Sequence, residues 1–253
     1  MSLIEPVFIG VDSTSGRSSF TYAMLDKDLH LLLLADGELE DVLSLIKEKP
    51  AVFLAINSPA NVNQGLLGKK LKADGSEQKK VRGAQMRLVE YELRQHGIAV
   101  SGTPSTIVAC PSWMQMGFNL YRALEKKGFA KYPKPDSQIQ LMETHPHACY
   151  CVMADTLPQP KPSLEGRLQR QLLLYEHGVQ IQDPMDFFEE ITRHKMMKGN
   201  WPIELLYNPE QLDALVAAFT AWLAINKPTH VVSFGNEKEG KIILPTHELK
   251  EKY

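Results

Sequence analysis

The order of the predicted elements indicates a mixed α/β fold in which an antiparallel meander is joined to parallel strands. Three β-type runs come first, at 7–12, 19–25 and 30–35, and the AspLysAsp between the last two is typical of a hairpin turn. Apolar residues at helical spacing over 38–48 then predict a helix. A further apolar run at 51–57, followed by Ser-Pro, predicts another buried strand.

This order, three strands, a helix and a fourth strand, is the one with which the RNase H-like architecture begins. The right-handed crossover rule places the fourth strand parallel to the first and beside it. The carboxyl ends of these two strands then open on one edge of the sheet, where the ligand crevices of open α/β sheets lie. We therefore expect an RNase H-like mixed sheet, with helices on both faces.

The rest of the chain continues the alternation, and residues 1–253 are expected to form one such domain. Further helices are predicted at 85–96, 112–127, from Pro146 onward, 163–177, 184–198 and 208–224. Further strands are predicted at 98–108 (an edge strand broken by Pro104), 138–143, 229–234 and 241–244.

The composition is that of an ordinary globular protein with no global affinity for polyanions. Hydrophobic residues make up 43% of the chain, and the net charge of -2 gives no overall basic field. The three cysteines are too few for a disulfide framework, which favours a reducing compartment. The apolar run at 29–35 is far shorter than the ~20 residues of a membrane helix. With no signal-type start, we expect a cytoplasmic protein without a membrane partner; its oligomeric state, a homodimer included, stays open.

Residues 61–82 are predicted to form a long basic loop that enters a helix near its end. Lysine and arginine outnumber the acids there, and large apolar residues are few. Loops of this length are often lids or binding loops. Lys69, Lys70 and Arg82 are candidates for contacts to a phosphate backbone, and Arg87 extends the positive charge along the next helix. A solvated loop without a ligand is the alternative.

Three acids stand where a site at the sheet edge would need them. Asp12 ends the first strand, Glu143 ends a later strand, and Asp213 lies near the start of the last long helix, in a run of small residues. Converging carboxylates repel one another, and a bound Mg²⁺ or Mn²⁺ removes that cost. Two such ions ~3.5–4 Å apart would activate water and stabilise the leaving oxygen of a phosphodiester.

Each of these residues also has a local interpretation. Asp12 precedes SerThrSerGly and can cap a turn, Glu143 can cap the following helix, and Asp213 can be an ordinary first-turn acid. His145, close to Glu143, is a candidate for a proton shuttle or a phosphate contact, or is a structural histidine. The alternation of His145, His147, Cys149 and Cys151 matches no common zinc motif.

Five fragments together resemble the "domain of unknown function 429" family of predicted RNase H-like nucleases. They are PheIleGlyValAsp at 8–12, AlaIleAsnSerProAla at 55–60, ArgLeuValGluTyrGluLeuArg at 87–94, GluThrHisProHisAla at 143–148 and LeuAspAlaLeuValAlaAlaPheThrAla at 212–221. The resemblance implies an RNase H-like fold and an acidic metal site at Asp12, Glu143 and Asp213. The segment 165–171 is similar as well, and its Arg167 either faces the site or pairs on the surface.

The chain departs from the family pattern at Asn57, a strand-end position that is commonly Asp. An amide oxygen can coordinate a hard cation but brings no charge. The absence of a carboxylate at this position therefore weakens the binding of a second metal ion most. Three hypotheses remain. The first is a metal-dependent nuclease, and the second is an ATP-binding phosphotransferase of the actin and sugar-kinase kind, whose phosphate loop GlyValAspSerThrSerGly at 10–16 would include Ser13. The third is a non-catalytic module that binds nucleic acid or another ligand.

Overall fold

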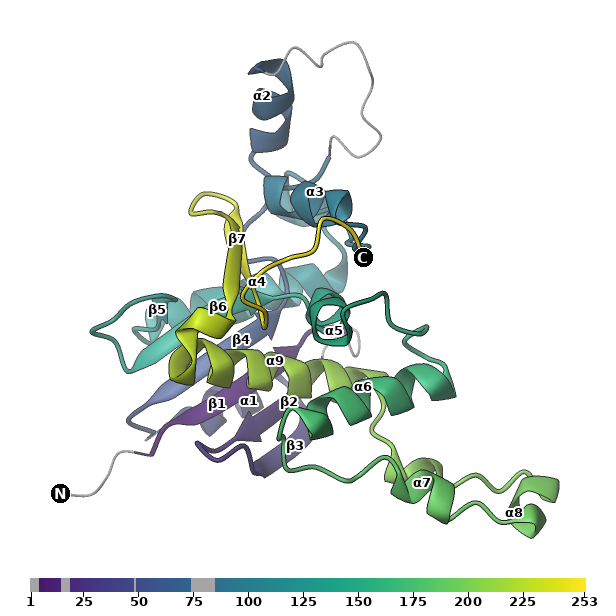
Figure 1. The fold of residues 1–253 in the computed structure, drawn as a ribbon. Coiled ribbons are helices and arrows are strands. Elements are labelled where there is room, and N and C mark those ends of the chain that lie inside the picture. The colour runs from purple at the N-terminus through teal and green to yellow at the C-terminus, as the bar shows by residue number, and fades with distance from the viewer. Residues whose placement is uncertain (1–4, 15–18, 48, 74–84) are drawn as a thin grey trace.

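The structure, a computed structural model, describes residues 5–14, 19–47, 49–73 and 85–253. Within them, a central sheet of eight strands runs in the order β3-β2-β1-β4-β6-β8-β7, with β5 paired to β6 (Figure 1). The strands are β1 Val7–Asp12, β2 Phe20–Leu25, β3 Leu31–Gly37, β4 Val52–Asn57, β5 Ala130–Lys131, β6 Ile139–Thr144, β7 Val232–Asn236 and β8 Gly240–Leu244. The helices are α1 Leu39–Leu45, α2 Leu66–Ala73, α3 Leu88–Gln95, α4 Ser112–Lys126, α5 Pro146–Ala154, α6 Leu164–Glu176, α7 Asp186–Glu189, α8 Arg193–Met197 and α9 Pro209–Asn226.

The pairing of the strands confirms the predicted mixed α/β class and the crossover. Strands β1, β2 and β3 form an antiparallel meander, while β4 lies parallel to β1 and β6 parallel to β4. In this register Asp12 lies opposite Asn57, and Ile56 lies opposite Glu143. The carboxyl ends of β1, β4 and β6 therefore share one edge of the sheet.

Helices cover both faces of the sheet, because the side chains of its inner strands alternate between two cores. Along β1, Val7, Ile9 and Val11 belong to a core completed by α1 and α4, whereas Phe8 belongs to the core beneath α9. Helix α9 contacts β1, β2 and β4, and α5 and α6 contact α9 from its outer side. This three-layer arrangement explains why both faces of β1, β2 and β4 are buried.

Helix α9 approaches the sheet closely because small residues meet at the crossing. A Cβ added at Gly10 would lie 2.0 Å from the Ala214 carbonyl oxygen and 2.3 Å from the Ala218 nitrogen. The Ala-rich run of α9 supplies the matching flat surface. This contact fixes the height of Asp213 above the end of β1.

Two predicted elements have a different structure. Residues 98–108 form no strand, because side chains of α3 bind their backbone groups. The Thr103 N–H donates to Glu90, and the Val100 carbonyl accepts a hydrogen bond from Arg94. Pro104 has no N–H to donate to a neighbouring strand. Residues 184–198 form the two short helices α7 and α8 instead of one. Thr192, in an extended conformation, interrupts them and caps α8 through its hydroxyl.

The predicted basic loop at 61–82 contains the helix α2 in its first half, and residues 74–84, including Arg82 and the predicted helix start near Gln78, lie outside the described residues. Figure 1 places α2 at the top of the molecule, beyond α3.

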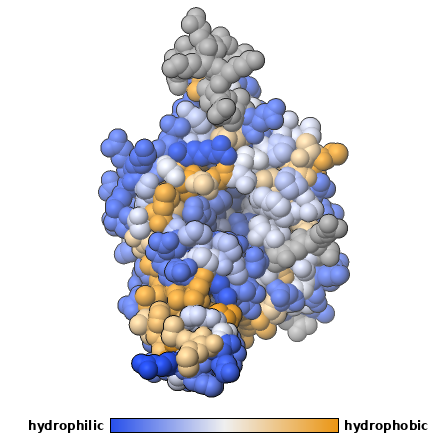
Figure 2. All heavy atoms as spheres, turned by 90° about the vertical axis from the view of Figure 1, so that its right-hand side faces the viewer, coloured by the Kyte–Doolittle hydropathy of each residue, from blue (hydrophilic) through white to orange (hydrophobic). Residues whose placement is uncertain are grey.

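Figure 2 shows a face that is hollowed near its centre, with apolar residues gathered at its lower end. Exposed large apolar side chains of the α7–α8 region are Met185, Phe188, Met196, Met197, Trp201 and Ile203. Among the described residues, no helix has the length and apolar character needed to cross a bilayer.

Candidate functional site

Asp12 is held at the end of β1 by two side-chain donors. It is fully buried; Asn57 Nδ2 donates to its Oδ1 at 2.5 Å, and the Thr14 hydroxyl donates to its Oδ2 at 2.7 Å. The first bond follows from the parallel register, which puts Asn57 beside Asp12. The second comes from the turn after the strand.

Asp213 meets a lysine from a distant segment of the chain. Lys161 lies in the stretch between α5 and α6, and its Nζ is 2.6 Å from Asp213 Oδ2 and 3.7 Å from Glu210 Oε1. Asp213 is 6% exposed, whereas the Lys161 side chain is 34% exposed. The ammonium group therefore covers a buried carboxylate from the solvent side.

Asp12 and Asp213 act on each other electrostatically, and Lys161 acts on both. Burial raises the pKa of Asp12, against the hydrogen bond from Thr14 and the charge of Lys161. Burial also raises the pKa of Asp213 to about 7; Lys161 opposes this and the charge of Asp12 adds to it. Burial lowers the pKa of Lys161, but the carboxylates Asp213 and Asp12 more than reverse this, so the lysine stays protonated. Two buried acids thus share one cation.

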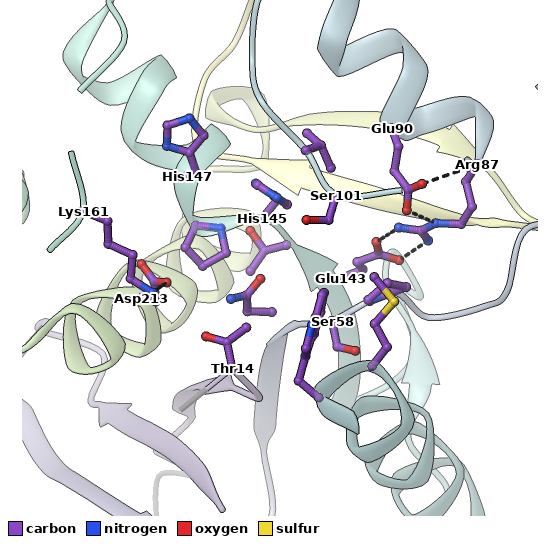
Figure 3. Close-up of a pocket in the computed structure, with 17 residues that line it drawn as sticks. Thr14, Ser58, Arg87, Glu90, Ser101, Glu143, His145, His147, Lys161 and Asp213 are labelled. Carbon is purple, nitrogen blue, oxygen red and sulfur yellow. Dashed lines mark hydrogen bonds and ion pairs between the residues drawn. The ribbon is translucent and has the colours of Figure 1, made fainter. Parts of the chain in front are cut away.

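Glu143, the third predicted acid, is engaged by an arginine on the other side of the pocket. Arg87 Nη1 donates to Glu143 Oε2 at 2.9 Å, Nη2 donates to Oε1 at 2.5 Å, and the Ala60 N–H donates to Oε2 at 2.8 Å. Figure 3 shows the Arg87–Glu143 pair and the Lys161–Asp213 pair on opposite sides, with His145 between them. The carboxylates therefore form two separate groups in this structure.

The Glu90 carboxylate and the Glu239 backbone carbonyl hold the Arg87 side chain in place. Its Nε donates to Glu90 at 2.7 Å, and its Nη1 also donates to the Glu239 carbonyl at 2.8 Å. Burial lowers the pKa of Arg87, but Glu143 and Glu90 outweigh this and raise it. The carboxylate of Glu239 accepts the N–H groups of Leu66 and Leu88, at the starts of α2 and α3. The start of α3 is thereby tied to the edge of the sheet.

Residues of both groups line one pocket with a cavity of about 170 Å³; Asp12 itself is not at its surface, but its partners Thr14 and Asn57 are. Thr14, Asn57, Lys161 and Asp213 lie on its polar side, together with His145 and His147 of the α5 start; Pro59, Val100, Trp113 and Met114 also line it. The pocket opens where Figure 3 shows the labelled side chains converging from β1, β6, α5, α9 and the α3 start. It is the crevice predicted at the carboxyl edge of the sheet.

His145 is held as a neutral hydrogen-bond donor. It is the N-cap of α5, and its Nδ1 accepts the Ala148 N–H at 3.2 Å, so the ring proton is on Nε2. Burial, with the positive groups nearby, lowers the pKa of His145 to about 3. Pro146 at the first helical position places the ring at the pocket. A neutral imidazole can donate to a substrate oxygen without adding charge.

A family model described as "Protein of unknown function (DUF429)" matches residues 10–239, which is most of the chain and includes both groups of carboxylates. The chain belongs to the DUF429 family. A search of curated proteins found no match.

Four other residues predicted for the site of this DUF429 protein lie in different parts of the structure: Ser13, Arg167, Lys69 and Lys70. The Ser13 hydroxyl donates to the Asn57 carbonyl at 2.9 Å and so ties β1 to β4. Arg167 donates to the carbonyls of Leu206 and Tyr207, and it does not line the pocket. Lys69 and Lys70 are exposed on α2, where Lys70 is 3.3 Å from Glu92. None of these three cationic side chains lines the pocket that Asp213 and Glu143 line.

Across residues 5–14, 19–47, 49–73 and 85–253, one group of three His, Cys, Asp or Glu side chains has ligand atoms within 4.8 Å of one another. It consists of Asp26, Asp28 and His30, which are mainly exposed on the β2–β3 turn. Asp12, Glu143 and Asp213 do not form such a group, since Glu143 is turned toward Arg87. The role of Glu143 as a metal ligand therefore stays a prediction.

Sequence reasoning missed several residues of the DUF429 pocket. Lys161 lies in a Pro-rich stretch between α5 and α6, and no motif connects it with Asp213. Thr14 was seen only as a turn former, although its hydroxyl binds Asp12. Trp113 and Met114 belong to the start of α4, and their amphipathic pattern indicates only a packed helix.

Proposed function

We propose that this DUF429 protein is a metal-dependent phosphodiesterase that hydrolyses nucleic acid at an RNase H-like site. One Mg²⁺ or Mn²⁺ would be bound by Asp12, Asn57 and Asp213. The observation that carries the proposal is the pair of buried carboxylates Asp12 and Asp213 at the carboxyl edge of β1, both in the field of the cation Lys161.

The residues fit such an ion by their chemistry. Carboxylate and amide oxygens are the donors that hard divalent cations prefer. Burial raises the pKa of both Asp12 and Asp213, so the site favours a bound positive charge over two free carboxylates. Asn57 donates through Nδ2 in this structure, and a flip of its amide would turn the oxygen toward the same point.

A bound divalent ion would polarise a phosphoryl oxygen and lower the pKa of a coordinated water. The protein's own groups would do the rest. Lys161, partly exposed, can turn from Asp213 to a substrate phosphate oxygen, and His145 can donate a hydrogen bond from Nε2. In the overall reaction, water adds to phosphorus and the P–O bond to the leaving oxygen breaks. Glu143, paired with Arg87, would shape the opposite wall.

One observation favours a second candidate, a non-catalytic module that binds nucleic acid or another ligand. Both carboxylates already have protein partners, since Asn57 and Thr14 bind Asp12 and Lys161 binds Asp213. A site satisfied in this way can hold a ligand without a metal. Metal dependence separates the two candidates.

The test is thermal unfolding with Mg²⁺, Mn²⁺ and ATP titrated separately, together with cleavage of labelled DNA and RNA oligonucleotides. A ligand specific for the folded state adds about 2.7 kcal/mol of stability at a hundredfold excess over its dissociation constant. The proposal expects a Mn²⁺ shift and cleavage in the wild type, and neither in Asp12→Asn or Asp213→Asn. The matched control is Asp28→Asn, which alters the exposed group on the β2–β3 turn.

A Mn²⁺ shift that disappears in Asp28→Asn but persists in Asp12→Asn would place the metal on the turn and contradict the proposal. Binding of oligonucleotides without metal or cleavage would favour the binding module. A shift with ATP alone would favour the phosphotransferase hypothesis.

A further inference from the structure

We infer that the pocket takes one unpaired nucleotide, with its phosphate at the Lys161 end and its base against Trp113. The substrate class is then single-stranded nucleic acid, or a strand end, rather than an intact duplex. The inference rests on the proposed function and names its substrate. It starts from the apolar side chains that share the pocket wall with the charged groups.

The polar end carries the groups that suit a phosphate and its metal. Thr14, Asn57, Lys161 and Asp213 line it, and the start of α5 adds His145. The rest of the wall carries apolar side chains, of which Val100, Trp113 and Met114 are the largest, together with the Arg87–Glu143 ion pair. A nucleotide combines both kinds of group, a charged phosphate joined to a flat, largely apolar base.

The size of the cavity suits a single nucleotide. A cavity of about 170 Å³ has room for about six waters at ~30 Å³ each, which is comparable to one base with part of its phosphate. A base that is stacked and paired in a duplex would have to leave its stack to lie against Trp113 in a recess of this size. The nucleotide must therefore arrive unpaired or be turned out of its stack.

Trp113 is fixed before any ligand binds. It packs on a small core of Cys110, Met114 and Phe118 in the first turns of α4. Helix α4 packs closely against the end of β4 because Gly117 has no side chain; a Cβ there would lie 1.8 Å from the Ser58 hydroxyl. A platform set in advance stacks a base without first losing side-chain entropy.

A polar side chain at the same wall lacks a partner. Ser58 is 3% exposed and lines the pocket, and its Oγ has no hydrogen-bond partner among the described residues. An unpaired buried hydroxyl is costly. Rotation of its side chain would present the hydroxyl to the edge of a base lying against Trp113. Ser58 thus offers a hydrogen-bonding group on the same wall as Trp113, as recognition of a base edge requires.

The test is equilibrium binding by fluorescence anisotropy, with Ca²⁺ as the divalent ion. The probes are a short fluorescein-labelled oligothymidylate, the same strand with abasic sites, and a blunt duplex. Stacking predicts that Trp113→Ala weakens binding of the oligothymidylate by about 5- to 150-fold, while Trp113→Phe keeps most of the affinity. The abasic strand should bind wild type and Trp113→Ala equally. The control is Trp201→Ala, an exposed tryptophan outside the pocket.

Equal affinity of Trp113→Ala and wild type for the oligothymidylate, tighter binding of the duplex, or no binding of any strand would each overturn the inference. Thermal unfolding of both Trp113 variants identifies a folding defect, and Trp113→Phe then decides the matter, because it retains an aromatic face. Binding that depends on Trp113 without any cleavage would leave the inference intact and reject hydrolysis. Cleavage that is indifferent to Trp113 would do the reverse.

Discussion

Replacing Arg87 by methionine tests whether the Glu143 group is a structural ion pair. Arg87 is 1% exposed, and its guanidinium supplies donors to Glu143 and Glu90 together. Methionine keeps much of the volume but removes every donor and the charge. Two buried carboxylates are then left without a cation.

The magnitude follows from the burial of both partners. Removing one member of a buried pair costs about 3–5 kcal/mol, because an uncompensated charge remains. For a domain whose unfolding free energy is about 5–15 kcal/mol, that is a third or more of the total. Glu143→Gln should cost less, since Arg87 keeps Glu90 and the amide still accepts one hydrogen bond.

The assay is urea unfolding of Arg87→Met, Glu143→Gln, Glu143→Leu and the double variant Arg87→Met/Glu143→Leu, each with and without Mn²⁺. If Arg87 and Glu143 form a structural ion pair, the double variant should lose less unfolding free energy than the two single variants lose together. The reason is that apolar replacement of both partners of a buried pair is often nearly neutral. An unchanged unfolding free energy for Glu143→Gln, combined with loss of the Mn²⁺ shift, would refute this reasoning. Glu143 would then be a metal ligand, as the sequence predicted.

Three further predictions follow from the same structure. Gly10→Ala should cost about 1–3 kcal/mol or more in urea unfolding, because its methyl group would meet the α9 backbone, while Gly68→Ala, with open space around it, should cost nothing. Asp213, with its pKa raised to about 7, takes up a proton on folding between its unfolded pKa and about 7. Metal-free protein should therefore lose stability as pH rises through that window, by at most about 1.4 kcal/mol per unit, and Asp213→Asn should flatten the curve. Lys161→Met should strengthen Mn²⁺ binding in calorimetry, since it removes the competing cation from Asp213; weaker binding would contradict that competition.

Much of the fold could be predicted because its signals are local. The continuous apolar runs of β1 and β4, and the helical spacing of α1 and α9, are visible in short windows of sequence. The structure has these elements within a few residues of the predicted ranges. Asp12 at the end of a strand and Asp213 in the first turns of a helix are local features of the same kind. The DUF429 resemblance, carried by such fragments, is confirmed over residues 10–239.

The sequence could not reveal the partners of the acids. Lys161 is 52 residues from Asp213, and Arg87 is 56 residues from Glu143, so no periodic pattern joins either pair. Nor could it show that 98–108 is not a strand, because side chains from α3 take the backbone groups of that segment. Burial decides these pairings, since each carboxylate removed from water needs a donor that the fold happens to bring within reach.

The sequence by itself thus determined the order of strands and helices, the edge of the sheet at which a site would form, and the acids that stand there. The tertiary structure alone decided that those acids separate into two groups, one facing Lys161 and one tied to Arg87, and that Trp113 of α4 lines the same pocket. The physical reason is that local periodicity sets which face of an element is buried, whereas charge neutralisation in the interior depends on contacts between segments far apart in the chain.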